Sequence, residues 1–355
     1  MEGSYNRHGG LTLVAMPGFE VMAQKVKDKI ELMAKEDEDK QATPVDVVYP
    51  IFGERASGEP YLRLGKDHIG GHDCVVITSG PGTYKMLIQL YFVLKYLAGR
   101  HAERMSVVSG YFPLSRSDKD EGSLEFALTR MIMDLFIAGS GEQLRRFVSA
   151  DLHSPQAVAA GPTGMVTEVS LVRRVLQRAI EDARKYSERV CLVLPDDGAA
   201  KRVGTALKDV QRKLGVELPV VFGAKRRLSS HESDIQQLFG ALDALRDATV
   251  ICLDDEIATG GTNIDTARLL KQNYGAKQVW AAVTHGVLCG DAPQKFALPA
   301  CPVDRVYIMD TIPFDDRPHL APLIALEKLS IVSWRDDLAW IVYCMHWGIN
   351  IRELR

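Results

Sequence analysis

The feature of this sequence that most limits its fold is an alternation of short apolar runs with longer stretches of helical periodicity. Runs rich in β-branched residues begin at Leu11, Cys74, Met105 and Arg145, and an amphipathic stretch follows each of the first three. A second series of the same kind extends from residue 170 to residue 312. Alternation of this type is typical of mainly parallel β-sheets flanked by helices on both faces. The sequence therefore predicts an α/β protein.

The chain has 355 residues, more than the roughly 100–200 residues of an ordinary domain. A stretch rich in Gly, Pro and Ala at 154–165 separates the two series. We therefore predict an N-terminal domain over 1–160 and a C-terminal domain over 161–332. Residues 333–355 carry apolar side chains at helical spacing, and we expect this helix to pack back onto the N-terminal domain.

Composition excludes several classes of protein. Hydrophobic residues make up 46% of the chain and charged residues 25%, with a formal net charge of -3, as in ordinary globular proteins. The charge gives no support to a nucleic-acid partner. The six cysteines show neither a CxxC pair nor zinc-ligand spacing, and no segment resembles a signal peptide or a membrane span. We expect a cytoplasmic protein with reduced cysteines and no membrane partner.

The stretch VICLDDEIATGGT, which begins at Val250, indicates a ligand site. A strand would deliver Asp254 and Asp255 to its carboxyl end, where open α/β sheets bind ligands, and a glycine turn would lead into the next helix. Glycine lets the backbone close around an anion, while free N–H groups and the helix dipole attract phosphate. Two adjacent acids can accept hydrogen bonds from vicinal hydroxyls, or reach them through a hydrated Mg²⁺.

This pattern fits a 5-phosphorylated ribose, with the hydroxyls on Asp254 and Asp255. The phosphate would bind four consecutive residues of the turn, namely Thr259, Gly260, Gly261 and Thr262. The alternative is a plain strand-to-helix connection with solvated acids. A Walker phosphate loop is excluded, because GxxxxGK[ST] does not occur at this site.

The two acids, three spacer residues and TGGT resemble the phosphoribosyl-diphosphate-binding motif of the phosphoribosyltransferase fold. Other motifs occur in a fixed order around it: GYFPLSRSDKDEG from Gly110, SADLHSPQ from Ser149, VLPDDGAAKRV from Val193, VVFGAKRR from Val220 and AAVTHGV from Ala281. Their order and spacing resemble those of the corresponding motifs in the ribose-phosphate pyrophosphokinase family, whose members are also called PRPP synthetases. The resemblance extends over nearly the whole chain.

The resemblance implies two similar type I phosphoribosyltransferase-like domains. It also implies transfer of the β,γ-diphosphate of Mg-ATP to the 1-hydroxyl of ribose 5-phosphate, giving PRPP and AMP for nucleotide biosynthesis. The partners would be ATP, ribose 5-phosphate and further copies of the chain, as a dimer or hexamer. Such a transfer depends on in-line positioning and charge neutralisation and needs no covalent enzyme intermediate.

The resemblance also implies roles for individual residues outside the turn. Lys225 and Arg227 would be catalytic clamps on the transferred phosphates. The ATP-binding residues would be Glu59, Arg116 and His153, and the Mg²⁺ ligands would be His153 and Asp196. From the residues alone, the basic cluster could equally be a solvated loop and the histidine a structural one.

Three positions depart from the usual family pattern. Ala258 stands where many members carry Asp, and Ser117, in SRSDK, stands where ARQDRK is usual. Arg55 stands where an aromatic residue normally precedes Gly-Glu, with Phe52 nearby but displaced. These departures leave two alternatives open: a non-catalytic or regulatory homologue, or an enzyme of the same fold that uses a different sugar phosphate or nucleotide.

Overall fold

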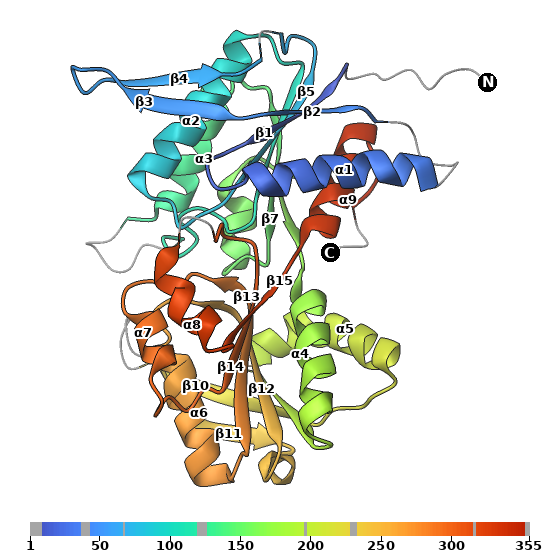
Figure 1. Ribbon diagram of the computed structural model, residues 1–355, viewed down its shortest axis with the longest axis vertical. Coiled ribbons are helices and arrows are strands. Elements are labelled where there is room, and N and C mark those ends of the chain that lie inside the picture. Colours follow the sequence, from blue (N-terminus) through green and yellow to red (C-terminus); the bar gives the residue numbers. More distant parts are fainter. Residues whose placement is uncertain are drawn as a thin grey trace. The chain divides into compact units, whose positions relative to one another are not determined.

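The computed structural model describes residues 9–36, 43–66, 68–118, 126–194, 197–227, 233–314 and 317–351. The chain divides into two compact units (Figure 1). The first unit runs to Ser170 and resumes at Trp334, and the second spans Leu171–Ser333. Within the described ranges, no helix is long and apolar enough to cross a membrane.

The first unit is built on a parallel sheet of six strands in the order β2-β1-β5-β6-β7-β8 (Figure 1). These strands are β1 (Leu11–Ala15), β2 (Val45–Val48), β5 (Asp73–Thr78), β6 (Arg104–Ser109), β7 (Leu144–Ala150) and β8 (Val166–Val169). An antiparallel hairpin of β3 (Pro50–Glu54) and β4 (Pro60–Leu64) follows β2. The helices are α1 (Glu20–Glu36), α2 (Tyr84–Gly99), α3 (Leu128–Gly139), the 3-10 helix η1 (Pro155–Ala160) and α9 (Arg335–Trp347).

Strand β5 shows why both faces of this sheet must be covered. All of its residues are buried, and successive side chains on a strand point to opposite faces. Cys74 and Val76 join a core cluster with residues of α2 and α3, among them Leu90 and Phe136. Helix α1 packs against β1, β2 and α9 (Figure 1). The near-continuous apolar run of β5 is therefore that of a central parallel strand.

The C-terminal helix α9 is anchored in the first unit by a buried ionic network. Asp73, whose side chain is 1% exposed, accepts hydrogen bonds from Arg104 Nε at 3.0 Å and from His346 Nδ1 at 2.8 Å. Arg104 also donates to the carbonyls of Met345 and His346 at the end of α9, at 2.8 and 3.1 Å. Burial alone would raise the pKa of Asp73, but the hydrogen bonds from His346 and Arg104 outweigh it and hold this pKa below its ordinary value.

The second unit has a seven-stranded sheet in the order β11-β10-β9-β12-β13-β14-β15 (Figure 1). The strands are β9 (Val190–Leu194), β10 (Val220–Arg227), β11 (Ser233–Gly240), β12 (Thr249–Ile257), β13 (Gln278–Gly286), β14 (Arg305–Met309) and β15 (Leu329–Val332). The helices are α4 (Val172–Tyr186), α5 (Asp197–Leu214), α6 (Gly261–Tyr274), α7 (Ala292–Ala297) and α8 (Ala321–Ala325), with 3-10 helices η2 (Leu242–Leu245) and η3 (Pro318–Leu320). All strand pairs are parallel except β10 with β11.

Apart from β11, which extends the second sheet at its edge, the two sheets share one strand order. In the first unit β1 lies between β2 and β5, and in the second β9 lies between β10 and β12; three further strands follow β5 and β12 in sequence order. In both units the strand order reverses beside the first strand, and ligands of open α/β sheets bind beyond the carboxyl ends of the strands at such a point. Strand β12 lies at this point in the second unit.

Two expectations differ from the structure. The first unit continues past residue 160 to Ser170, because β8 forms a parallel ladder with β7 and so extends the first sheet. The basic residues of VVFGAKRR, which the sequence places after the apolar run PVVF and which we expected to lie in a loop, instead belong to β10, because this strand continues through Arg227. Its antiparallel ladder with β11, which has an irregularity between Ala224 and Lys225, provides the hydrogen bonds that keep this segment extended.

Candidate active site

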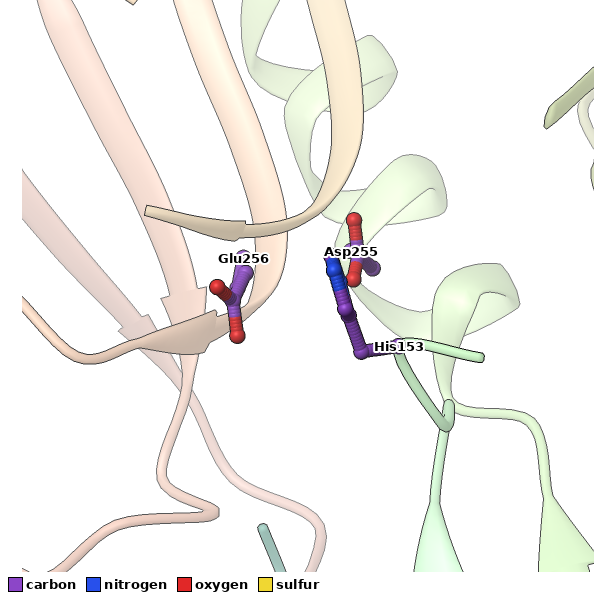
Figure 2. Close-up of side chains that lie close together, drawn as sticks. All are labelled: His153, Asp255 and Glu256. Carbon is purple, nitrogen blue, oxygen red and sulfur yellow. The ribbon is translucent and has the colours of Figure 1, made fainter. Parts of the chain in front are cut away.

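Strand β12 places three consecutive carboxylates at its carboxyl end. The strand is central in its sheet, with β9 and β13 paired on either side, and its first residues are buried. Asp254 and Asp255 are half-buried, and the Asp255 N–H donates to Asp254 Oδ1 at 3.0 Å. A carboxylate oxygen of Asp255 and one of Glu256 lie within 4.8 Å of each other, and both side chains are drawn in Figure 2. The end of the strand thus gathers several carboxylates in one place.

Glu256 is a candidate that the sequence analysis missed. Its side chain is buried, with the residue 6% exposed, and its partner on β13 is His285. His285 is also buried, and its Nδ1 lies 3.0 Å from Thr311 Oγ1. A buried carboxylate is costly unless polar groups accompany it, and the strand register places the polar residue His285 beside Glu256. The signal that could have identified Glu256 is its place directly after the two predicted acids, Asp254 and Asp255.

Gly260 and Gly261 have different roles in the turn that follows β12. Gly260 is the N-cap of α6 with φ +76°, and a Cβ added there would lie 2.5 Å from Phe296 Cε2. Phe296, on α7, is fully buried. A Cβ at Gly261 would meet no atom within 4 Å. The fold therefore requires glycine at Gly260, whereas Gly261 leaves open space beside the first turn of α6.

The start of α6 has the properties of an anion site. The first N–H groups of a helix have no acceptor within the helix, and the helix dipole adds positive potential there. The Thr259 side chain is exposed and that of Thr262 is half-buried, so neither is enclosed by the core. One continuous strand, turn and helix thus brings together the six residues expected to bind a phosphorylated ribose: Asp254, Asp255, Thr259, Gly260, Gly261 and Thr262.

The carboxyl end of β12 suits a hard cation. Mg²⁺ prefers oxygen ligands and is usually held by one or two carboxylates together with water and substrate phosphates. Asp254, Asp255 and Glu256 supply carboxylates of this kind, so the residues present fit Mg²⁺. The expected ligand His153 is half-buried in the loop after β7, from which its ring projects in Figure 2. The expected ligand Asp196 lies outside the described residues.

The basic residues of β10 lie near its carboxyl end. Lys225 pairs with Ile235 and Arg227 with Ser233 in the β10–β11 ladder. Because β10 is parallel to β9 and β9 to β12, the carboxyl ends of β10 and β12 face the same edge of the sheet. The backbone positions of both residues are compatible with the expected site, while their side chains lie outside the description.

The other expected residues belong to the first unit. Arg116 and His153 follow the adjacent parallel strands β6 and β7, so both lie at the same edge of that sheet. Glu59 is exposed in the turn of the β3–β4 hairpin and accepts a hydrogen bond from Ser57 Oγ at 2.8 Å. The Arg55 N–H donates to the Glu59 carbonyl at 2.9 Å, which closes this turn.

The hairpin also contains Tyr61, an aromatic residue that the sequence analysis did not consider. Phe52 packs against the core of the first unit. Tyr61 pairs with Gly53 across the hairpin, and a Cβ at Gly53 would overlap the Tyr61 ring. The guanidinium carbons of Arg55 and Arg63 lie 5.9 and 5.2 Å from the centroid of that ring. The PYLRL segment thus supplies a half-buried aromatic ring flanked by two cations.

Ser117 is engaged in holding the start of α3. Its hydroxyl accepts a hydrogen bond from the Leu128 N–H at 3.3 Å. Its carbonyl accepts a hydrogen bond from Thr129 Oγ1 at 2.8 Å. The short side chain at this departure from the family pattern therefore has a local structural role.

Comparisons with known proteins agree with this geometry. The family described as Phosphoribosyl synthetase-associated domain matches residues 240–331, which include β12, the glycine turn and α6. A ribose-phosphate pyrophosphokinase of Rhodopirellula baltica is 30% identical over 283 residues, covering 79% of this chain and 84% of that protein. Ribose-phosphate pyrophosphokinase 2 of Schizosaccharomyces pombe is 27% identical over 326 residues, covering 86% of this chain and 94% of that protein.

The structural likeness extends over both units. The crystal structure of phosphoribosylpyrophosphate synthetase from Mycobacterium smegmatis matches with a TM-score of 0.71 and 26% identity, covering 96% of this chain and 99% of that one. The predicted α/β fold of two type I phosphoribosyltransferase-like domains is confirmed by this match. From its sequence and its fold together, the chain belongs to the ribose-phosphate pyrophosphokinase family.

Proposed function

We propose that this protein is a ribose-phosphate diphosphokinase that transfers the β,γ-diphosphate of Mg-ATP to the 1-hydroxyl of ribose 5-phosphate. The products are PRPP, for nucleotide biosynthesis, and AMP. The observation that carries the proposal is the strand, turn and helix of the second unit, in which carboxylates and a glycine turn follow one another at the carboxyl edge of the sheet. Membership of the family supports the same activity.

The sugar phosphate has a defined orientation in this proposal. Its 5-phosphate accepts hydrogen bonds from the N–H groups of residues 259–262, and Gly261 leaves room for it. Its 2- and 3-hydroxyls donate to Asp254 and Asp255. The anomeric hydroxyl then points away from the turn, where it is free to attack the β-phosphorus of ATP in line with the departing AMP oxygen.

Charge neutralisation accounts for the remaining residues. Lys225 and Arg227 offset the negative charge of the transferred diphosphate, and Arg116 donates to ATP phosphate oxygens. His153 and Asp196 hold Mg²⁺, which when bound offsets charge on the ATP phosphates. Glu59 contacts ATP from the β3–β4 hairpin.

The direct test is to incubate the purified protein with ATP, Mg²⁺ and ribose 5-phosphate and to follow AMP and a 1-diphosphorylated sugar by phosphorus NMR. We expect both products in equal amounts and no AMP without ribose 5-phosphate. A variant with Asp254→Asn and Asp255→Asn serves as the inactive control. Absence of both products with Mg²⁺, Mn²⁺ and Co²⁺ would show that the proposal is wrong.

A second candidate is the same diphosphoryl transfer from a different nucleotide. Phe52 packs against the core and Ser117 holds the start of α3. Both residues belong to the segments that the resemblance assigns to ATP binding, and both segments depart from the usual family pattern. This departure favours the second candidate. A panel of ATP, GTP, CTP and UTP with ribose 5-phosphate separates the two candidates. A kcat/KM for another nucleotide above that for ATP would select the second.

The proposal includes a cytoplasmic homo-oligomer, a dimer or a hexamer, which family membership supports. The absence of disulfides among the cysteines fits a reducing compartment, since all six are free. Light scattering coupled to size-exclusion chromatography measures the assembly. A mass of one chain at micromolar concentration would contradict this part of the proposal.

A further inference from the structure

A half-buried arginine binds the loop that supports the glycine turn. Arg317, in the segment after β14, donates from Nη1 to the carbonyl of Gly286 at 2.8 Å and from Nη2 to the carbonyl of Val287. These carbonyls lie at and just beyond the end of β13. Burial lowers the pKa of Arg317 to about 10, so the guanidinium stays charged at neutral pH. Its two donors thus fix two consecutive peptide groups.

The next residue has an unfavourable backbone conformation. Leu288 is fully buried with φ +46°, in a region that side chains other than glycine rarely adopt. Such a conformation persists only where the surroundings hold it in place. Arg317 holds the two carbonyls that precede Leu288. The N–H of the same Val287–Leu288 peptide group donates to the Ile257 carbonyl at 2.9 Å.

The same loop contacts the phosphate turn at two points. The Cys289 N–H donates to the Ala258 carbonyl at 3.0 Å, so residues 257 and 258, directly before the turn, are both held. The Cys289 carbonyl accepts a hydrogen bond from the Ala292 N–H at 3.2 Å at the start of α7. Helix α7 carries Phe296, the ring against which Gly260 lies. The loop therefore supports the turn both before and at Gly260.

We propose that Arg317 is a positioning residue for the phosphate-binding turn and sets the affinity of the second unit for a 5-phosphorylated sugar. The inference rests on the proposed function, because it assigns a support to the sugar-phosphate site. Arg317 acts through backbone groups and does not touch the ligand. A lysine offers a single point charge in place of a planar fork, so it cannot hold both carbonyls in the same way.

The experiment compares Arg317→Met and Arg317→Lys with Arg268→Gln. Arg268 lies further along α6, 51% exposed, and pairs with Asp265 on the same helix. We expect Arg317→Met to raise the KM for ribose 5-phosphate about tenfold or more, since small displacements of a binding group are costly. The KM for ATP should stay within about twofold, Arg317→Lys should be intermediate, and Arg268→Gln should match the wild type. A parallel rise in both KM values, or none, would overturn the inference.

Direct binding separates this inference from the proposed function. Calorimetry with ribose 5-phosphate alone requires no turnover, and the dissociation constant should rise about tenfold in Arg317→Met, equivalent to about 1.4 kcal/mol. If the wild-type protein binds ribose 5-phosphate but forms no product, the proposed enzymatic activity is refuted. The comparison of dissociation constants between the wild type and Arg317→Met still tests the role of Arg317. Equal affinities in the wild type and the variant would refute the role of Arg317.

Hydrogen exchange provides a readout that needs no ligand. Peptides spanning 253–266 should exchange faster in Arg317→Met than in Arg268→Gln. The reason is that the N–H groups of Leu288 and Cys289, which bond the carbonyls of residues 257 and 258, are no longer held in place. Equal exchange in the two variants would overturn the inference even if the wild type bound no sugar phosphate. If Arg317→Met does not fold, as judged by circular dichroism, the same comparisons are made with Arg317→Lys.

Discussion

Gly260 and Gly261 are neighbours in the glycine turn, and the same added methyl group should affect them in opposite ways. At Gly260, φ is +76°, which costs a residue with a Cβ about 1–2 kcal/mol. The new Cβ would lie 2.5 and 2.8 Å from two ring carbons of Phe296, which is fully buried and cannot move without repacking the core. Overpacking of this kind costs about 1–3 kcal/mol. Gly260→Ala should therefore lower the free energy of unfolding of the second unit by about 2–5 kcal/mol.

Gly261→Ala should leave the fold intact. Gly261 begins α6, and its Cβ would meet no atom within 4 Å. Replacing glycine by alanine at a compatible position stabilises by about 0.4–1 kcal/mol through the unfolded chain. The methyl group would, however, occupy the space proposed for the 5-phosphate. Loss of one hydrogen bond to a charged group is worth about 1.5–3 kcal/mol, so the KM for ribose 5-phosphate should rise about 10- to 100-fold.

Denaturant unfolding measures the first effect, with circular dichroism and tryptophan fluorescence as separate probes because the chain has two units. Steady-state kinetics with ribose 5-phosphate measures the second. Phe296→Leu in the Gly260→Ala background should recover part of the lost stability, which a double-mutant cycle would show as coupling. The reasoning fails if Gly260→Ala is as stable as the wild type, or if Gly261→Ala keeps the wild-type KM.

Three further predictions concern other parts of the molecule. Asp73→Asn should destabilise the first unit by about 3–5 kcal/mol at neutral pH, because it removes the buried carboxylate charge with which Arg104 and His346 pair. The folded-state pKa of Asp73 lies below its ordinary value of 3.8. The contribution of Asp73 to the free energy of unfolding is therefore complete above pH 3.8 and is lost as the pH falls through the lower folded-state pKa. The free energy of unfolding should accordingly fall less steeply with acid pH in Asp73→Asn than in the wild type. Tyr61→Ala should raise the KM for ATP about 2- to 10-fold if its ring stacks on the base, and an unchanged value would exclude that contact. Lys225→Ala should lower kcat about 10²- to 10³-fold with little change in melting temperature, and wild-type turnover would remove Lys225 from the catalytic residues.

Several functional features lay beyond local sequence patterns. The acidic residue Glu256 follows the two predicted acids directly, but its burial beside His285 depends on the pairing of β12 with β13. Tyr61 becomes prominent only because Gly53 lies opposite it and Phe52 packs into the core. Arg317 lies about thirty residues beyond the loop that it supports, in a segment with no recognisable motif.

The sequence by itself determined the class of fold and predicted the centre of the proposed site. Apolar alternation reflects burial of parallel strands on both faces, and DDEIATGGT contains within a few residues both the carboxylates and the glycine turn that a sugar phosphate requires. These features depend on interactions between residues close in the chain, so a linear pattern is enough to reveal them. The first unit's extension to β8, the continuation of β10 through Arg227 and the ionic contact that anchors α9 were decided by the tertiary structure alone. Each depends on partners distant in sequence, and in the last case Asp73 and His346 meet across 273 positions.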